Sequence, residues 1–198
     1  MAKKIILALI ILILLSFLII GYLSQHSSVN IYIDGENVSV KTYSLSPNED
    51  LNDEICDFTV LFMNGTDCNI NNLKNNISSI CEKYGVENAE INIDSSIGKN
   101  QVPVSVKVSG TSMLPTLQDG QILLLNKTHD IQVGDIVVAN SSEYGGIIKR
   151  VGDINGDSIY LISDNKNISY EVINGRLYEI KGITTWVDIS DINGVIIN

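Results

Sequence analysis

A serine placed between two chain-breaking residues is the first feature of this sequence with chemical potential. A glycine and a proline flank Ser112 in the segment 110–117, and the alternating run 102–108 leads into it. Glycine and proline end a strand and restrict the turn that follows, so the Ser112 hydroxyl is held on a stiff turn. About thirty-five residues further on, Lys149 interrupts the apolar stretch 146–151. Ser112 and Lys149 are our candidates for a nucleophile and its general base.

A lysine can act as a general base only when its amine is neutral. In water the pKa of lysine is about 10.4, but burial penalises the charged form and can lower this pKa by up to ~3–5 units. Strand alternation puts Lys149 on the same face as Ile147 and Val151, which is the apolar environment that a dry base needs. The alternative is an edge-strand lysine whose stem packs while its amine reaches water.

A serine hydroxyl becomes a useful nucleophile once a base removes its proton. The tetrahedral intermediate also needs hydrogen-bond donors, and the backbone N–H of Ser112 can supply one of them. Gly110 has no side chain to supply a second. The alternative for Ser112 is a turn serine that caps its own backbone.

The elements that position this pair begin with an apolar segment at the N-terminus. Residues 5–23 carry no charge, and a bilayer core of about 30 Å needs roughly 20 apolar residues as a helix. Lys3 and Lys4 precede the segment and the next lysine is Lys41, which predicts a cytoplasmic N-terminus and an external body. We therefore interpret residues 1–27 as a membrane anchor and tether, with a cleaved secretory signal as the alternative.

The charge balance excludes one class of partner. The chain of 198 residues has 13 basic and 23 acidic residues, a net charge of -10, so nucleic acid is not an expected partner. Nucleotide, metal and haem motifs are absent from the sequence, and we expect no cofactor. Of the three cysteines, Cys56, Cys68 and Cys81, any pair could oxidise outside the cytoplasm, and the sequence does not select one.

Residues 28–98 predict a small α+β domain. Two alternating runs around a glycine-containing turn predict a hairpin over 30–43. Apolar residues at spacings of three and four predict a helix over 69–84, and alternation predicts a strand over 89–94. The stretch 55–63 is ambiguous between helix and strand. We find no catalytic constellation here and expect a spacer or lid rather than a binding module.

Residues 99–198 predict a mainly β domain. Short alternating runs recur every 8 to 12 residues with glycine-containing turns between them, and no helical period appears after residue 100. This pattern is typical of a barrel-like or sandwich fold. The expected strands after the Ser112 turn are 121–125, 136–139, 146–151 and 158–162, followed by a hairpin within 172–180.

Four segments in order carry a resemblance to a known superfamily. They are 112–117, 134–138, 148–151 and 163–169, within a stretch from about residue 108 to 182. Together they resemble the serine–lysine peptidases that include type I signal peptidases and SOS-repressor-type self-cleaving proteins. The resemblance implies the mainly β peptidase fold of that superfamily, with Ser112 as nucleophile and Lys149 as general base.

The resemblance also implies supporting residues. Asp164 matches the family's aspartate, and Ser169 falls at the position of a serine that helps to orient the lysine. Gly110 occupies the place where some members have an oxyanion serine. We further expect an apolar surface near Met113 and Leu114 to contact the substrate or the membrane.

These expectations combine into a membrane-anchored serine endopeptidase that resembles signal peptidase I. It would cleave exported proteins after small residues in an Ala-x-Ala-like pattern, so its partners would be a protein substrate and the membrane. One alternative is a self-cleaving or single-substrate peptidase of the same superfamily. Another is a non-enzymatic surface interaction domain that keeps the fold. The sequence does not indicate an oligomeric state.

Overall fold

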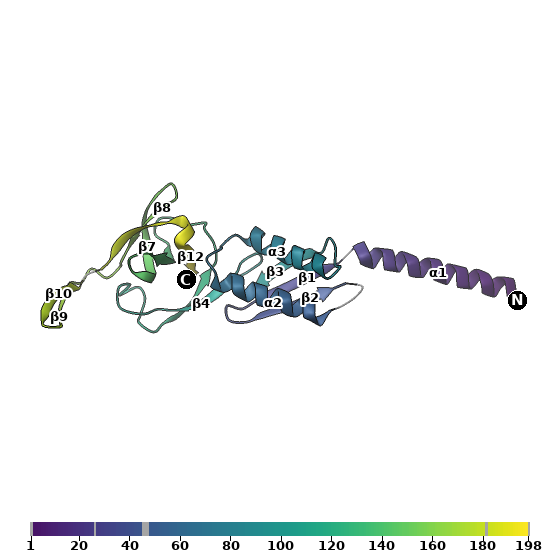
Figure 1. Ribbon diagram of the computed structural model, residues 1–198, viewed down its shortest axis with the longest axis horizontal. Helices are drawn as coiled ribbons and strands as arrows, with labels where there is room; N and C mark the ends of the chain where they lie inside the picture. Colours follow the sequence, from purple (N-terminus) through teal and green to yellow (C-terminus); the bar gives the residue numbers. More distant parts are fainter. Residues whose placement is uncertain (1, 26, 45–47, 181, 198) are drawn as a thin grey trace.

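Three parts follow one another along the long axis of the molecule (Figure 1). The computed structural model describes residues 2–25, 27–44, 48–180 and 182–197. An N-terminal helix leads to a small α+β unit, and a mainly β domain with a seven-stranded sheet follows. The predicted fold class is therefore confirmed.

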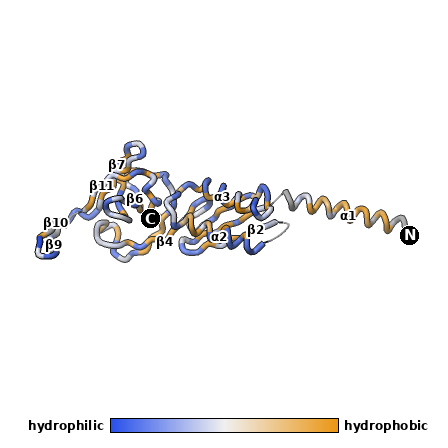
Figure 2. The backbone as a smooth tube through the Cα atoms, viewed as in Figure 1, coloured by the Kyte–Doolittle hydropathy of each residue, from blue (hydrophilic) through white to orange (hydrophobic). Residues whose placement is uncertain are grey.

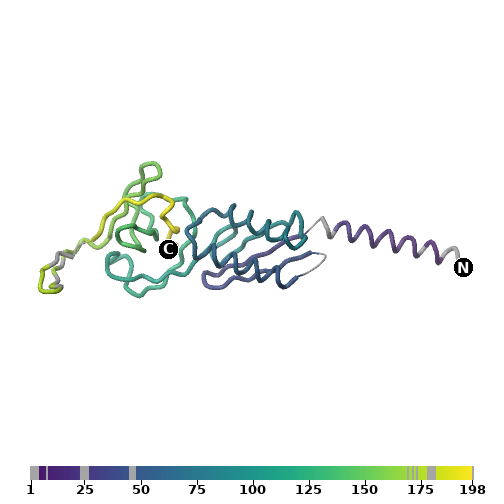
Figure 3. The backbone as a smooth tube through the Cα atoms, in the orientation of Figure 1, coloured from purple at the N-terminus to yellow at the C-terminus, as the bar shows by residue number. Residues whose placement is uncertain are grey.

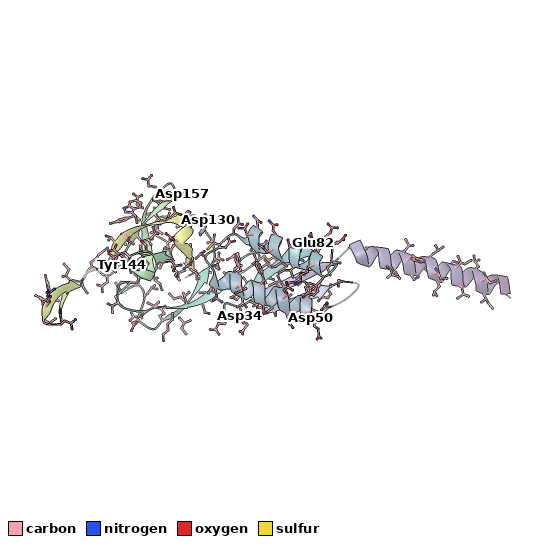
Figure 4. The ribbon with its side chains drawn as sticks, viewed as in Figure 1. Asp34, Asp50, Glu82, Asp130, Tyr144 and Asp157 are labelled. Atoms are coloured by element: carbon pink, nitrogen blue, oxygen red, sulfur yellow. The ribbon has the colours of Figure 1, made fainter. Side chains whose placement is uncertain are left out.

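Helix α1 (Ala2–Gln25) extends away from the other elements of the chain (Figure 1). Its segment Ile5–Tyr22 is long and apolar enough to cross a membrane, and none of that segment is buried. Figure 2 shows an apolar tube along most of α1, and Figure 4 shows its side chains radiating with no other element beside them. At about 1.5 Å per residue, such a helix matches a bilayer core in length.

The small α+β unit is one sheet covered on one face by two helices. Its elements are β1 (Ser28–Ile33), β2 (Val38–Tyr43), α2 (Glu49–Asn64), α3 (Ile70–Lys83) and β3 (Glu90–Ser95). Strand β1 is central, antiparallel to β2 and parallel to β3, and the two helices connect the edge strand β2 to the other edge strand β3. The predicted hairpin, helix and third strand are confirmed.

The ambiguous stretch 55–63 is helical and belongs to α2. The Asn48 side chain accepts a hydrogen bond from the backbone N–H of Asp50 and caps the helix, and acidic residues occupy its first turn. Buried residues then recur at helical spacing, which turns one face of α2 onto the sheet. These buried residues are Leu51, Ile55, Thr59, Phe62 and Met63.

The β domain contains all the remaining strands. They are β4 (Pro103–Lys107), β5 (Ile122–Asn126), β6 (Ile136–Ser141), β7 (Gly145–Asn155), β8 (Ser158–Ile162), β9 (Ser169–Ile173), β10 (Arg176–Ile180), β11 (Thr184–Asp188) and β12 (Ile192–Ile197), with a 3-10 turn at Ile189–Asp191. Seven of them form a sheet in the order β11-β8-β7-β6-β12-β5-β4, while β9 and β10 pair with each other. The C-terminal strand β12 lies within the sheet, so the C-terminus lies inside the β domain and far from the N-terminus (Figure 3).

Three apolar clusters fill the two folded parts. One lies between the sheet and helices of the small unit and includes Val102. Two lie in the β domain, one around β6, β7 and β8 and the other around the Ser112 turn. Val104 packs against both the first and the third cluster, so strand β4 joins the core of the small unit to that of the β domain.

Polar contacts also fasten the small unit to the β domain. The buried Lys127 amine donates to the backbone oxygen of Gly65 at 2.6 Å. The Cys68 thiol donates to the backbone oxygen of Asn193 at 3.2 Å. All three cysteines are free thiols, so the possible disulfide of the sequence analysis is not formed in this structure.

Gly194 allows the closest approach between β12 and β5. It has a φ of +145°, and a Cβ added there would lie 2.2 Å from the backbone oxygen of Asn126. We expect Gly194→Ala to lower the free energy of unfolding by roughly 3 kcal/mol, because strain and overlap add. Chemical denaturation measures this loss. Gly156→Ala is the control, since φ there is +59° with nothing within 4 Å of the added carbon; equal losses in both variants would contradict the argument.

Candidate active site

The turn that carries Ser112 is anchored on both sides. Met113 and Leu117 are buried in the third apolar cluster, which pins the turn to the sheet. Gly110 adopts a φ of +89°, and its N–H donates to Asp119 Oδ1 at 2.8 Å. Among the hydrogen bonds of the described residues, none uses the backbone N–H of Ser112, so this donor is available to a developing oxyanion.

Lys149 lies on the buried face of β7. Ile147, Lys149 and Val151 alternate with more exposed residues, as the sequence pattern predicts. Lys149 is only 3% exposed, although lysine is among the residues least often buried without a partner. Its position on this face therefore calls for a specific contact at its amine.

That contact is Ser112. Lys149 Nζ donates to Ser112 Oγ at 2.7 Å and to the backbone oxygen of Ile148 at 3.0 Å. Burial lowers the pKa of Lys149 below the ordinary value for lysine. Once the amine has lost its proton, the same 2.7 Å contact lets the serine hydroxyl donate to the nitrogen lone pair. The arrangement fits a nucleophile and a general base.

The pair opens into a groove of about 550 Å³. Tyr144 lines it, together with apolar side chains from β4, β6, β7 and the segment before β11. These apolar side chains are Val106, Val138, Ile147, Ile148 and Ile183. A hollow of about 620 Å³ lies on the open sheet face of the small unit, where Tyr32, Lys41 and Asp94 contribute to a lining of polar and apolar groups. The chemistry belongs to the smaller groove, because the serine and lysine meet there.

A charged clasp joins the Ser112 turn to the Lys149 strand. Arg150 Nε and Nη2 donate to the two carboxylate oxygens of Asp164 at 2.8 and 2.5 Å. The Thr116 hydroxyl donates to the same carboxylate at 2.6 Å. The Arg150 guanidinium, with help from Thr116, holds the pKa of Asp164 below its ordinary value. Arg150 and Thr116 thus hold Asp164 between the strand of the base and the turn of the nucleophile.

The loop after Asp164 also holds the backbone of the nucleophile. The Asn165 N–H donates to the carbonyl of Ser112 at 3.0 Å, and its side-chain amide donates to the carbonyl of Thr111 at 2.9 Å. Sequence reasoning missed Thr116 and Asn165. The only signal was their position within the matching segments 112–117 and 163–169, since contacts of this kind have no periodicity.

The remaining expected site residues stay predictions. Met113 is 2% exposed and lines the groove, and its expected contact with the substrate or the membrane stays a prediction. Burial of its apolar side chain also anchors the turn. Leu114 is half-buried, and its contact role stays a prediction. The side chain of Ser169 lies outside the described part of the structure, so its expected role in orienting the lysine also stays a prediction.

No metal centre is formed by the residues that the structure describes. Groups of three or more His, Cys, Asp or Glu side chains arranged to hold a metal ion do not occur among them. Within the described groove, the charged contact at the serine is the Lys149 amine.

The β domain contains a buried lysine that contacts a serine in an open groove. This arrangement is typical of serine–lysine peptidase-type proteins. The family model described as Peptidase S24-like matches residues 77–185, more than half of the chain, and the chain belongs to this family. Comparison with curated proteins and with solved structures found no match. The matched region begins inside α3 and includes both Ser112 and Lys149. Membership gives the class of the protein and does not by itself select a substrate.

Proposed function

We propose that this chain is a membrane-anchored serine endopeptidase that cleaves exported polypeptides, with Ser112 as nucleophile and Lys149 as general base. The observation that carries the proposal is the 2.7 Å contact between Lys149 Nζ and Ser112 Oγ, made by a lysine that is almost fully buried. A neutral amine takes the hydroxyl proton while Oγ attacks the peptide carbonyl. Lys149 then gives that proton to the leaving amine, and water hydrolyses the acyl-enzyme.

The groove supports a polypeptide as the substrate. Strand β4 is at the edge of the seven-stranded sheet, and residues 106–109 line the groove beyond the point where the N–H of Ser105 donates to Gly35. An extended chain can add to such an edge through backbone hydrogen bonds. The apolar lining favours small apolar side chains next to the scissile bond, in agreement with an Ala-x-Ala-like site.

The anchor supports an exported substrate. Helix α1 contains a segment, Ile5–Tyr22, with the length and composition of a membrane span, and lysines precede this segment but do not follow it closely. In the proposed topology the N-terminus is cytoplasmic and the groove is external. Substrate and enzyme then meet on the outer side of the same membrane.

The test is cleavage of a preprotein with an Ala-x-Ala site by the full chain in liposomes. We expect a single cut at that site and covalent labelling of Ser112 by a serine-reactive probe, with both lost in Ser112→Ala. Ser158→Ala, an exposed serine on β8, is the matched control and keeps both. An inert wild-type chain that no probe labels would favour a non-enzymatic role. Clipping of the purified chain itself would favour self-cleavage.

A further inference from the structure

The hairpin of β9 and β10 is an apolar ribbon that projects from the β domain. Among the described strands, β9 and β10 pair only with each other, and none of their described side chains belongs to an apolar core. Isolated two-stranded hairpins are marginally stable in water, and exposed apolar groups on them mark interaction sites. The exposed fractions are 58% for Ile168, 62% for Tyr170, 69% for Val172 and 68% for Leu177.

Three of these side chains lie on one face. Val172 and Leu177 are directly opposite each other in the β9–β10 register. Tyr170 is two residues from Val172 on the same strand and therefore shares its face. We name Tyr170, Val172 and Leu177 the apolar ribbon face.

The base of the hairpin adjoins the groove. On one side, Asn165 donates to the carbonyl of Ser112, and on the other, Ile183 lines the groove. A polypeptide leaving the groove on this side meets the hairpin within a few residues. A strand of five residues extends about 17 Å, so the ribbon lengthens the binding surface by roughly five substrate residues.

The position of the hairpin argues against the bilayer as its partner. Figure 1 shows β9 and β10 at the end of the long axis opposite to α1. A membrane that holds α1 is therefore at the other end of the molecule. In addition, β9 and β10 each keep one free backbone edge, which suits an extended polypeptide.

Because the hairpin adjoins the groove, we infer that the apolar ribbon face binds an extended apolar segment of the substrate, adjacent to the scissile bond. The inference rests on the proposed peptidase function and adds a second specificity element to it. The groove selects small residues at the cut, and the ribbon selects an apolar flank. The partner is thus one polypeptide that occupies both surfaces.

The experiment uses the full chain in detergent micelles and pairs of fluorogenic peptides with the same Ala-x-Ala site. One peptide of each pair carries an apolar segment of about five residues, placed on either side of the site, and the other carries serine and asparagine instead. We expect wild type to show a KM about tenfold lower for one of the apolar peptides. Val172→Ser combined with Leu177→Ser removes this difference and leaves kcat for the polar peptide unchanged.

Leu61→Ser is the matched control, because Leu61 on α2 is also 68% exposed but lies in the small unit. It keeps the tenfold difference. The inference is overturned if the double variant keeps the difference too, or if wild type has none. Sedimentation that shows a wild-type dimer dissociating in the double variant would also overturn it, in favour of a second copy.

If no peptide is cleaved, the proposed function fails, but a binding measurement still tests the role of the apolar ribbon face. Fluorescence anisotropy of the labelled apolar peptide with Ser112→Ala measures binding without turnover. We expect Kd to rise about tenfold when Val172→Ser and Leu177→Ser are added. An unchanged Kd overturns the inference independently of catalysis.

Discussion

Lys149→Met will reduce kcat/KM for peptide cleavage by about a thousandfold or more while the protein stays folded. Methionine fills a similar volume, but its thioether sulfur is too weakly basic to take the Ser112 proton. Removing one member of a nucleophile–base unit costs several orders of magnitude in rate. Because Lys149 is 3% exposed, exchange of its buried amine for an apolar group is close to neutral for stability. Thermal unfolding of both proteins checks the second point.

The pH profile identifies the base. Burial lowers the pKa of Lys149 from the ordinary 10.5, so activity of the wild type should rise with pH through that lowered pKa and reach its plateau before pH 10.5. Stability should also rise between the lowered and the ordinary pKa, since the unfolded chain binds the proton there and the folded chain does not. The arginine in Lys149→Arg stays charged, so this variant should be inactive. If Lys149→Arg had wild-type activity, Lys149 would not be the general base.

Asp164→Asn will lower kcat by about a hundredfold with little change in KM. The substitution keeps the side-chain shape but removes the charge that holds Arg150 and Thr116, so the Ser112 turn loses its link to β7. Misplacement of reacting groups by about 1 Å costs this much in rate. We also expect a loss of roughly 2–3 kcal/mol in the free energy of unfolding, because a partly buried guanidinium loses its partner. Steady-state kinetics and chemical denaturation measure the two effects.

The dependence of stability on pH in the acid range distinguishes the contribution of this clasp from a general surface effect. Since the pKa of Asp164 is lowered, its stabilisation is present above the ordinary carboxyl pKa of 3.8 and disappears as pH falls through the lowered value. That part of the pH dependence should be missing in Asp164→Asn. Asp157→Asn, in the exposed turn between β7 and β8, is the control and should keep kcat. Equal kinetics in the two variants would show that the clasp does not position the site.

The sequence predicts the reacting pair from signals that are visible within about ten residues. Gly110 and Pro115 flank Ser112 and end the strand run before it, and Lys149 interrupts an apolar face. The clasp of Arg150, Asp164 and Thr116 joins three distant segments, and no local pattern pairs them. The sequence did not show that Met113 is buried, because its neighbours do not reveal which side of a turn faces the core.

Topology escaped prediction for the same reason. The last strand, β12, inserts between β5 and β6, which are much earlier in the chain. Its alternation identifies a strand and contains no information about the neighbours of that strand. The segment 55–63 has β-branched and aromatic residues that suit either state, and its packing on the three-stranded sheet selects the helix.

The small α+β unit lies between α1 and the groove (Figure 1), and in the proposed topology it sets a minimum distance between the membrane and the cut site. A unit of about 70 residues is roughly 25 Å across. An extended chain covers about 3.4 Å per residue, so a substrate held by its own span in the same bilayer needs roughly eight residues to reach the groove. Cut sites closer to the bilayer are out of reach, whatever their sequence. Distance from the membrane would then select substrates before any side chain is recognised.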